Sequence, residues 1–141
     1  MPFWRHIADA RGENYVAMCG RDAAGQAERV WSTVQSMGLP LPFRAGLDFG
    51  CGHGRFVPKL AEFGETLFVA DLLPDSAAVA ATRSPKAQVA PLEWPCRLGL
   101  GDGRIDFLWT CFVLQHITDE GLLGEVAAEL RRVLKPGARV I

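Results

Sequence analysis

Three glycines and two aspartates in this sequence have the types and spacing of a ligand-binding site. Gly50, Gly52 and Gly54 occupy alternate positions directly after an apolar run, and Asp48 precedes the first of them by two residues. A glycine-rich turn lets the backbone approach a ligand closely, because no Cβ stands in the way. Asp71 ends a second apolar run about twenty residues further on, where α/β nucleotide folds place a carboxylate against ribose hydroxyls. The pattern predicts a site for an adenosine-containing ligand, with a helix N-cap or solvated turn as the alternative role for Asp71.

A strand, a turn and a helix must follow one another to position these residues. The apolar run 45–49 predicts a strand, and the periodic segment 55–63 after the glycines predicts a helix. This order begins an α/β nucleotide-binding unit. Further strands are expected at 66–70, 88–90, 105–110 and 138–141, and further helices at 74–83 and after Thr118, its expected N-cap. The apolar stripe of that last helix comprises Leu122, Leu123, Val126, Leu130, Val133 and Leu134. The alternation predicts a doubly wound α/β fold with a mostly parallel sheet.

The glycine spacing separates several nucleotide-binding classes. A dinucleotide fingerprint reads G-x-G-x-x-G, whereas the glycines here follow G-x-G-x-G, and Arg55-Phe56 replaces the G-K-[ST] of a phosphate loop. The stretch resembles motif I of the class I S-adenosylmethionine-dependent methyltransferases, D-x-G-x-G-x-G. The words DGRIDFLW and FVLQHI resemble that family's fourth strand and the loop after it, and Leu134-Lys135-Pro136-Gly137 resembles its turn before the fifth strand. The resemblance extends over about residues 45–141.

The resemblance implies a Rossmann-like methyltransferase fold with S-adenosylmethionine as its cofactor. In that family the backbone at 50–52 would face the methionine part of the cofactor, and Asp48 would organise the loop or accept from the methionine ammonium. Asp71, with Leu72 beside it, would hold the ribose. The other cofactor-binding positions that the resemblance implies are Gly50, Cys51, Gly52, His53, Gly54, Glu93, Trp94, Cys111 and Phe112.

The segment after the third strand departs from the family pattern. An acidic residue usually stands just past this strand, near the adenine, but Ala90 and Pro91 occupy the aligned positions. Glu93 is the first acid and would stand in for it. Trp94 would pack on the adenine face, or it belongs to the core.

Methyl transfer from a sulfonium depends chiefly on holding donor and acceptor in line, so no dedicated catalytic residue is required. His116 is the candidate general base because imidazole titrates near neutral pH, with a structural role as the alternative. His53 would touch a ligand or lie in a solvated loop, and nothing marks Cys51 as a reactive thiolate. The four cysteines show no C-x-x-C pair, so no metal site is predicted.

Composition narrows the choice of partners and compartment. The chain has 141 residues and a net charge of −1 without a basic stripe, which disfavours a nucleic-acid substrate. No apolar run is long enough to span a bilayer, and the N-terminal residues lack the features of a signal peptide. Reduced cysteines fit a cytoplasmic protein. We expect a small-molecule methyl acceptor; the alternatives are a non-catalytic or fragmentary cofactor-binding module of this fold and, less favoured, an NAD-dependent oxidoreductase.

The two ends of the chain carry separate expectations. Residues 1–44 are expected to form a helical cap, with one or two helices within 3–19 and another over 23–37, whose apolar stripe is Ala23, Ala27, Val30, Val34 and Met37. The sheet of domain 45–141 is incomplete after its fifth strand. This suggests a truncated sequence first, a minimal domain second and a sheet completed by a partner third. An open sheet edge also allows self-association.

Overall fold

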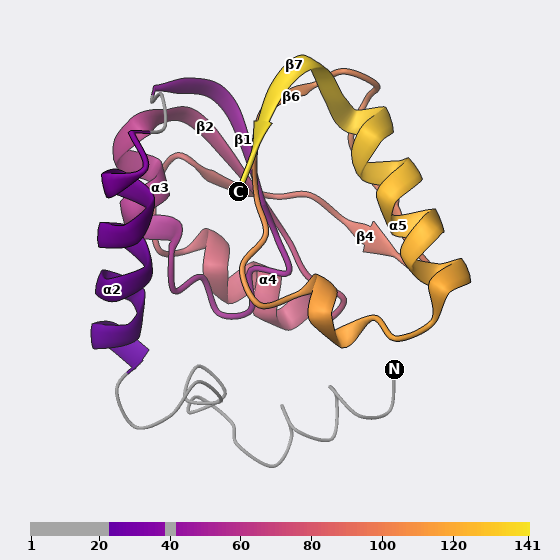
Figure 1. The fold of residues 1–141 in the computed structure, drawn as a ribbon, viewed down its shortest axis with the longest axis horizontal. Coiled ribbons are helices and arrows are strands. Elements are labelled where there is room, and N and C mark those ends of the chain that lie inside the picture. The colour runs from indigo at the N-terminus through magenta and orange to yellow at the C-terminus, as the bar shows by residue number, and fades with distance from the viewer. Residues whose placement is uncertain (1–22, 39–41) are drawn as a thin grey trace. The chain divides into compact units, whose positions relative to one another are not determined.

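The computed structural model describes residues 23–38 and 42–141 (Figure 1). The chain divides into two compact units, residues 1–42 and 43–141, which are described separately. In the first unit, helix α2 spans Ala23–Ser36. Trp31 and Val34 are its buried apolar residues, whereas Met37, expected on the buried stripe, is exposed. The helices expected within 3–19 lie outside the described residues.

The second unit is built on a five-stranded parallel sheet with the strand order β3-β2-β1-β6-β7. The strands are β1 (Phe43–Phe49), β2 (Gly64–Ala70), β3 (Ala87–Val89), β6 (Ile105–Trp109) and β7 (Leu134–Val140). The three central strands are largely buried, as strands covered by helices on both faces must be. The predicted α/β class and parallel sheet are confirmed.

Helices α3 (Val57–Phe63) and α4 (Pro74–Ala81) connect β1 to β2 and β2 to β3, and α5 (Glu120–Val133) precedes β7. From β1 the chain adds strands first on the side of β2 and β3 and then on the opposite side, where β6 and β7 lie. Because parallel crossovers are right-handed, the helices that belong to the two directions lie on opposite faces of the sheet. Figure 1 shows α5 across the sheet from α3. On α5, Val126, Leu130 and Val133 are buried as the stripe predicted, but Leu123 is exposed.

The end of the sheet at which the strands begin is closed by aromatic packing and one carboxylate. The Phe43 and Phe107 rings stack with centroids 4.7 Å apart. A Cβ added to Gly64 would lie 2.1 Å from the Phe43 ring, so a glycine is needed where β2 passes it. Asp106 accepts from the backbone N–H groups of Arg44 and Ala45 and pairs with Lys135, which joins β1, β6 and β7.

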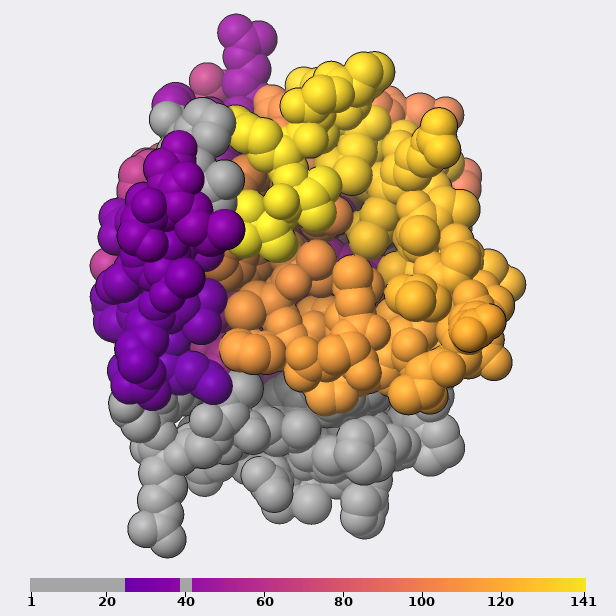
Figure 2. All heavy atoms as spheres, viewed as in Figure 1, coloured from indigo at the N-terminus to yellow at the C-terminus, as the bar shows by residue number. Residues whose placement is uncertain are grey.

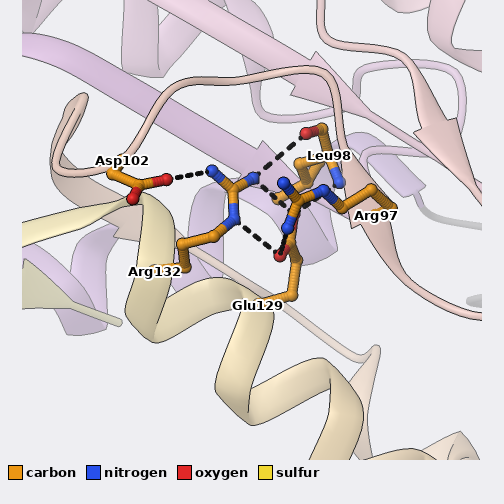
Figure 3. Close-up of polar contacts among 5 residues, drawn as sticks. All are labelled: Arg97, Leu98, Asp102, Glu129 and Arg132. Carbon is orange, nitrogen blue, oxygen red and sulfur yellow. Dashed lines mark hydrogen bonds and ion pairs between the residues drawn. The ribbon is translucent and has the colours of Figure 1, made fainter.

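The connection from β3 to β6 contains a short hairpin and no helix. Its strands, β4 (Leu92–Glu93) and β5 (Arg97–Leu98), pair antiparallel. Two paired positions do not make a stable hairpin in water, so tertiary contacts must hold it. The side chain of Glu129 on α5 supplies one, accepting from the Leu98 N–H at 2.7 Å and from Arg97 at 3.2 Å (Figure 3).

Arg132, one turn after Glu129, completes this network (Figure 3). Its guanidinium donates to both oxygens of Glu129, at 2.8 and 2.6 Å, and to the Leu98 carbonyl at 3.2 Å. It also pairs with Asp102 at 2.6 Å. Both backbone groups of Leu98 are therefore bonded to α5, which replaces the third strand that the hairpin lacks.

Two sequence expectations for the C-terminal part are wrong in detail. The N-cap of α5 is Asp119 instead of Thr118, because the Asp119 carboxylate accepts from the N–H of Leu122 at 2.8 Å. The expected turn at 134–137 is a bulge within β7: Leu134 already pairs with Ile105, and the register shifts before the next pair. Gly137, inside that bulge, has a positive φ of 77°. The bulge accommodates the extra residues that β7 has relative to its partner β6.

No helix in the described part of the chain has the length and apolarity to cross a membrane.

Figure 2 shows the segment between β6 and α5, in orange, on the surface next to α5.

Candidate functional site

The glycine turn lies at the carboxyl end of β1 and is anchored to β2. The N–H groups of Gly50 and Cys51 both donate to the carbonyl of Ala70, at 2.8 and 3.1 Å. Gly50, Gly52 and Gly54 have positive φ angles of 74°, 53° and 78°. Residues with a Cβ rarely adopt this conformation, so the backbone itself requires the glycines that the sequence singled out.

The turn is also packed tightly by two other segments. A Cβ on Gly50 would lie 2.3 Å from Val113, in the loop after β6, and one on Gly54 would lie 2.8 Å from the Cα of Ala80 on α4. The side chain of Arg83 donates to the carbonyl of His53, joining the turn to the end of α4. Some of the space next to Gly50 and Gly54, where a ligand was expected to approach the backbone, is thus occupied by atoms of the protein.

Asp71 lies beside the turn, as its position after β2 predicted. Its Oδ2 accepts from the Gly52 N–H at 2.8 Å and its Oδ1 from the Leu73 N–H at 2.9 Å. Burial raises the pKa of Asp71, and the N–H groups of Leu73 and Gly52 oppose that rise. A carboxylate has about four lone-pair sites, so these two bonds leave each oxygen able to accept a ligand hydroxyl.

Asp48 is the most deeply buried charge-bearing group of the site, with 3% of its surface exposed. Its Oδ2 has no hydrogen-bond partner among the described residues. Burial, and then the nearby Asp71 carboxylate, raise the pKa of Asp48 to about 7, against the opposing charge of Arg55. An acceptor buried without a partner is costly, and a cationic donor from a ligand would satisfy it.

The chemistry of Cys51 follows from the same surroundings. Its thiol is buried and donates to the Gly52 carbonyl at 3.4 Å. Burial, followed by the carboxylates of Asp48 and Asp71, raises the pKa of the thiol. A thiol with a raised pKa stays protonated and is a poor nucleophile, so Cys51 fills space in the turn.

The loop after β6 brings Val113 to the turn and Phe112 to Arg55, the residue that follows the turn, whereas the site role of Cys111 stays a prediction. Phe112 has a φ of 61° and lies within cation–π distance of Arg55, whose guanidinium carbon is 5.8 Å from the ring centroid. Val113 packs against Gly50. His116 lies further along, in the 3-10 helix η2 (Leu114–His116), exposed, with a ring nitrogen 3.5 Å from the Gln115 amide nitrogen.

Two of the remaining candidates lie on the β4–β5 hairpin, and the third, Leu72, follows β2. Glu93 is exposed and pairs with Arg97 across the hairpin. Trp94, in the turn between β4 and β5, is 54% exposed, so the alternative that it belongs to the core is wrong. Leu72 lies between Asp71 and Leu73 and is half-buried. The site roles of Glu93, Trp94 and Leu72 remain predictions.

Four residues that contribute to the site were not predicted: Arg55, Ala80, Thr110 and Val113. Arg55 had a usable signal, because it follows the glycine turn directly in the sequence, and its charge acts on Asp48. Thr110 follows β6, and its hydroxyl oxygen is buried without a hydrogen-bond partner among the described residues. Ala80 and Val113 reach the glycines through tertiary packing, which their local sequence does not reveal.

No group of three or more His, Cys, Asp or Glu side chains within residues 23–38 and 42–141 is arranged to hold a metal ion. The arrangement that the site does present is a glycine turn flanked by the buried Asp48 and the half-buried Asp71, at the carboxyl edge of a parallel sheet. Open α/β sheets bind ligands at this edge.

A glycine turn of this kind on a five-stranded parallel sheet is typical of α/β proteins that bind a nucleotide cofactor. Comparison of the sequence with protein families identifies which of these families the chain matches. Residues 47–141 match the family described as methyltransferase domain. Because the match covers more than half of the chain, the protein belongs to this methyltransferase family. The predicted membership is confirmed. None of the curated proteins matches the sequence significantly.

Solved methyltransferase structures share the fold. Phosphoethanolamine N-methyltransferase 1 of Haemonchus contortus, solved with phosphoethanolamine and S-adenosylhomocysteine, superposes with a TM-score of 0.74 at 18% identity, over 94% of this chain. A TehB-like S-adenosylmethionine-dependent methyltransferase of Corynebacterium glutamicum gives 0.66 at 22% identity over 96%. One from Aquifex aeolicus gives 0.62 at 20% over 94%. These identities establish the fold alone.

The chain differs from these structures in length. It spans 28% of the Haemonchus chain, 71% of the Corynebacterium chain and 68% of the Aquifex chain.

Proposed function

We propose that the protein binds S-adenosylmethionine and transfers its methyl group to a small-molecule acceptor. The observation that carries the proposal is the buried Asp48 oxygen beside the glycine turn, which has no hydrogen-bond partner in the part of the chain that the structure describes. S-adenosylmethionine brings an ammonium and a sulfonium, and a buried carboxylate favours cations. The pyrophosphate of NAD would instead bring negative charge toward Asp48 and Asp71, which argues against the oxidoreductase alternative.

The described residues suggest how the cofactor would be held. The Asp48 carboxylate and the Thr110 hydroxyl would accept from the methionine ammonium, because each has a buried oxygen that bonds to none of residues 23–38 and 42–141. The carboxylate of Asp71 would accept from the ribose hydroxyls while keeping its bonds to Gly52 and Leu73. Helix α3 would contribute little to holding the cofactor, because it has only seven residues and begins at Val57, after the turn.

When bound, the cofactor supplies a methyl group activated by the sulfonium: an acceptor lone pair bonds to the methyl carbon, the carbon–sulfur pair returns to sulfur, and the acceptor releases a proton. The role of this chain is to hold the two partners in line and exclude water. His116 is proposed as a base for the released proton.

The acceptor class and compartment are proposals of the same kind. The net charge of −1, without a basic stripe, supports a small molecule over a nucleic acid. Cys51 and Cys96 are thiols, which supports the cytoplasm as the compartment.

Calorimetry with S-adenosylhomocysteine tests the cofactor assignment. We expect the unmodified chain to bind it and Asp71→Ala to weaken binding at least tenfold, because the ribose hydroxyls lose their acceptor. Asp75→Ala removes an exposed carboxylate four residues away and should leave the affinity unchanged. A folded chain that binds NAD but not S-adenosylhomocysteine would contradict the proposal. Cofactor binding without turnover on any acceptor would favour the non-catalytic module.

A further inference from the structure

Phe112 has an unfavourable backbone conformation. With a φ of 61°, it is the one non-glycine residue in the described ranges with a positive φ. The left-handed region crowds the Cβ of an ordinary residue against the backbone, and a bulky aromatic side chain is seldom found there. Such strain persists only where the surrounding structure enforces it, and it concentrates at functional sites.

The neighbours of Phe112 enforce the conformation. On one side, the Thr110 N–H donates to the Ile141 carbonyl at 2.8 Å, which fixes the end of β6. On the other, the Val113 side chain packs onto Gly50, and its carbonyl accepts from the His116 N–H at 3.0 Å. The chain must turn sharply between these two fixed points, and Phe112 occupies the turn.

Burial of the ring does not compensate for this strain. Phe112 is 41% exposed, whereas Trp109, three residues earlier, is 1% exposed. A glycine would satisfy the backbone better, and a polar residue would suit the exposed position better. The stability of the fold therefore does not explain why a phenyl ring stands here.

The exposed ring is nevertheless held in place. Trp109 packs against Phe56 with ring centroids 4.9 Å apart. The Arg55 guanidinium carbon lies 5.0 Å from the centroid of Phe56 and 5.8 Å from that of Phe112. This series of contacts extends from the core to the surface and restrains the ring beside the glycine turn.

The position of the ring relates it to the transfer site. Arg55 is near enough to Asp48 to oppose the rise of its pKa, and Val113, the next residue, touches Gly50. These contacts place Phe112 beside the glycine turn. That turn would face the methionine part of the proposed cofactor, where an acceptor must approach.

We propose that Phe112 contacts the methyl acceptor and selects one that presents a flat, apolar ring next to its nucleophilic atom. The inference rests on the proposed function. A restrained phenyl face gains more from stacking with an aromatic ring than from contact with a puckered one of similar size. The acceptor is therefore an aromatic compound rather than an aliphatic one.

A matched pair of neutral probes isolates this preference. Benzyl alcohol and cyclohexylmethanol carry the same nucleophile and differ in the flatness of the ring. With the chain saturated with S-adenosylhomocysteine, ligand-observed NMR should show benzyl alcohol bound at least fivefold more tightly. Phe112→Ala and Phe112→Gly should abolish the difference, and Phe112→Tyr should retain it. Because Phe112 is also among the predicted cofactor-binding positions, the S-adenosylhomocysteine affinity of each variant is measured first, and the two alcohols are then compared with each variant saturated.

Controls separate this role from a structural one. Phe112→Gly should melt at the same temperature as the unmodified chain or higher, because it removes the backbone strain. Leu123→Ala truncates another exposed apolar side chain, and the preference should survive it. Equal binding of the two alcohols, no binding of benzyl alcohol, or a preference unchanged in Phe112→Ala would each overturn the inference. Failure to bind S-adenosylhomocysteine would instead contradict the proposed function.

Discussion

At the scale of single residues, the site concentrates negative charge where water is excluded. Asp48 and Asp71 lie at the ends of neighbouring strands, and the Asp71 carboxylate adds to the cost of ionising the buried Asp48. Ionising Asp48 beside the Asp71 carboxylate is costly, and a nearby cation such as Arg55 reduces that cost. A site of this type prefers a ligand that brings positive charge with it.

The pH dependence of stability tests this arrangement. The pKa of Asp48 is raised to about 7 in the folded chain from 3.8. Between these pH values the folded state holds a proton that the unfolded state has lost, so stability must fall as the pH rises. The total loss is on the order of a few kcal/mol, since one pKa unit corresponds to about 1.4 kcal/mol.

Asp48→Asn should remove most of this loss, so its advantage over the unmodified chain should grow from pH 4 to pH 7. Urea unfolding at a series of pH values measures it. Asp75→Asn, an exposed carboxyl, serves as the control. An unchanged pH profile in Asp48→Asn would contradict the assignment.

At the scale of elements, the β4–β5 hairpin depends on α5. Leu98 is held at its N–H by Glu129 and at its carbonyl by Arg132. Arg132 is the main cause that lowers the pKa of Glu129 to about 2, with the Leu98 N–H and Arg97 contributing. A group whose pKa is depressed in the folded state stabilises above its unfolded value and loses that contribution as the pH falls.

Glu129→Gln should therefore cost about 2 kcal/mol at pH 7, the range for a hydrogen bond to a charged group. The difference from the unmodified chain should shrink as the pH falls from about 4.5 toward 2. Thermal unfolding across this pH range provides the measurement. Glu125→Gln makes the same change at an exposed position one turn earlier on α5 and should have little effect. Equal losses in both variants would refute the network's role.

At the scale of the whole molecule, β7 forms one edge of the sheet, with no strand on its outer side among the residues described. Exposed edges pair with other chains unless something interrupts them. The bulge at 135–138, with Pro136 and a pairing shift, interrupts this one. Self-association through the edge is therefore proposed to be weak in the chain as it stands.

Pro136→Val should strengthen self-association, because it restores an N–H donor and adds a β-branched side chain at the edge. Sedimentation velocity at several protein concentrations would show a shift toward dimer. Pro58→Val places the same side chain at an exposed position on α3 and should not shift the distribution. A dimer that forms equally with and without the change would exclude the edge as its interface.

The sequence by itself determined the features that depend on local sterics and periodicity. Alternate glycines require a turn with positive φ at Gly50, Gly52 and Gly54, and the apolar runs around them predict parallel strands and their helices. Asp71 comes to the turn because parallel strands end at a common edge. From these features the α/β fold and the family followed.

Only the tertiary structure decided how distant segments share the site. Val113 packs on Gly50, and Glu129 bonds to Leu98 across 31 residues of sequence. The strain at Phe112 arises because both of its neighbouring segments are fixed by other elements. Such contacts depend on the mutual placement of elements, which hydrophobic periodicity does not encode, since it records which face is buried and not which residue it meets.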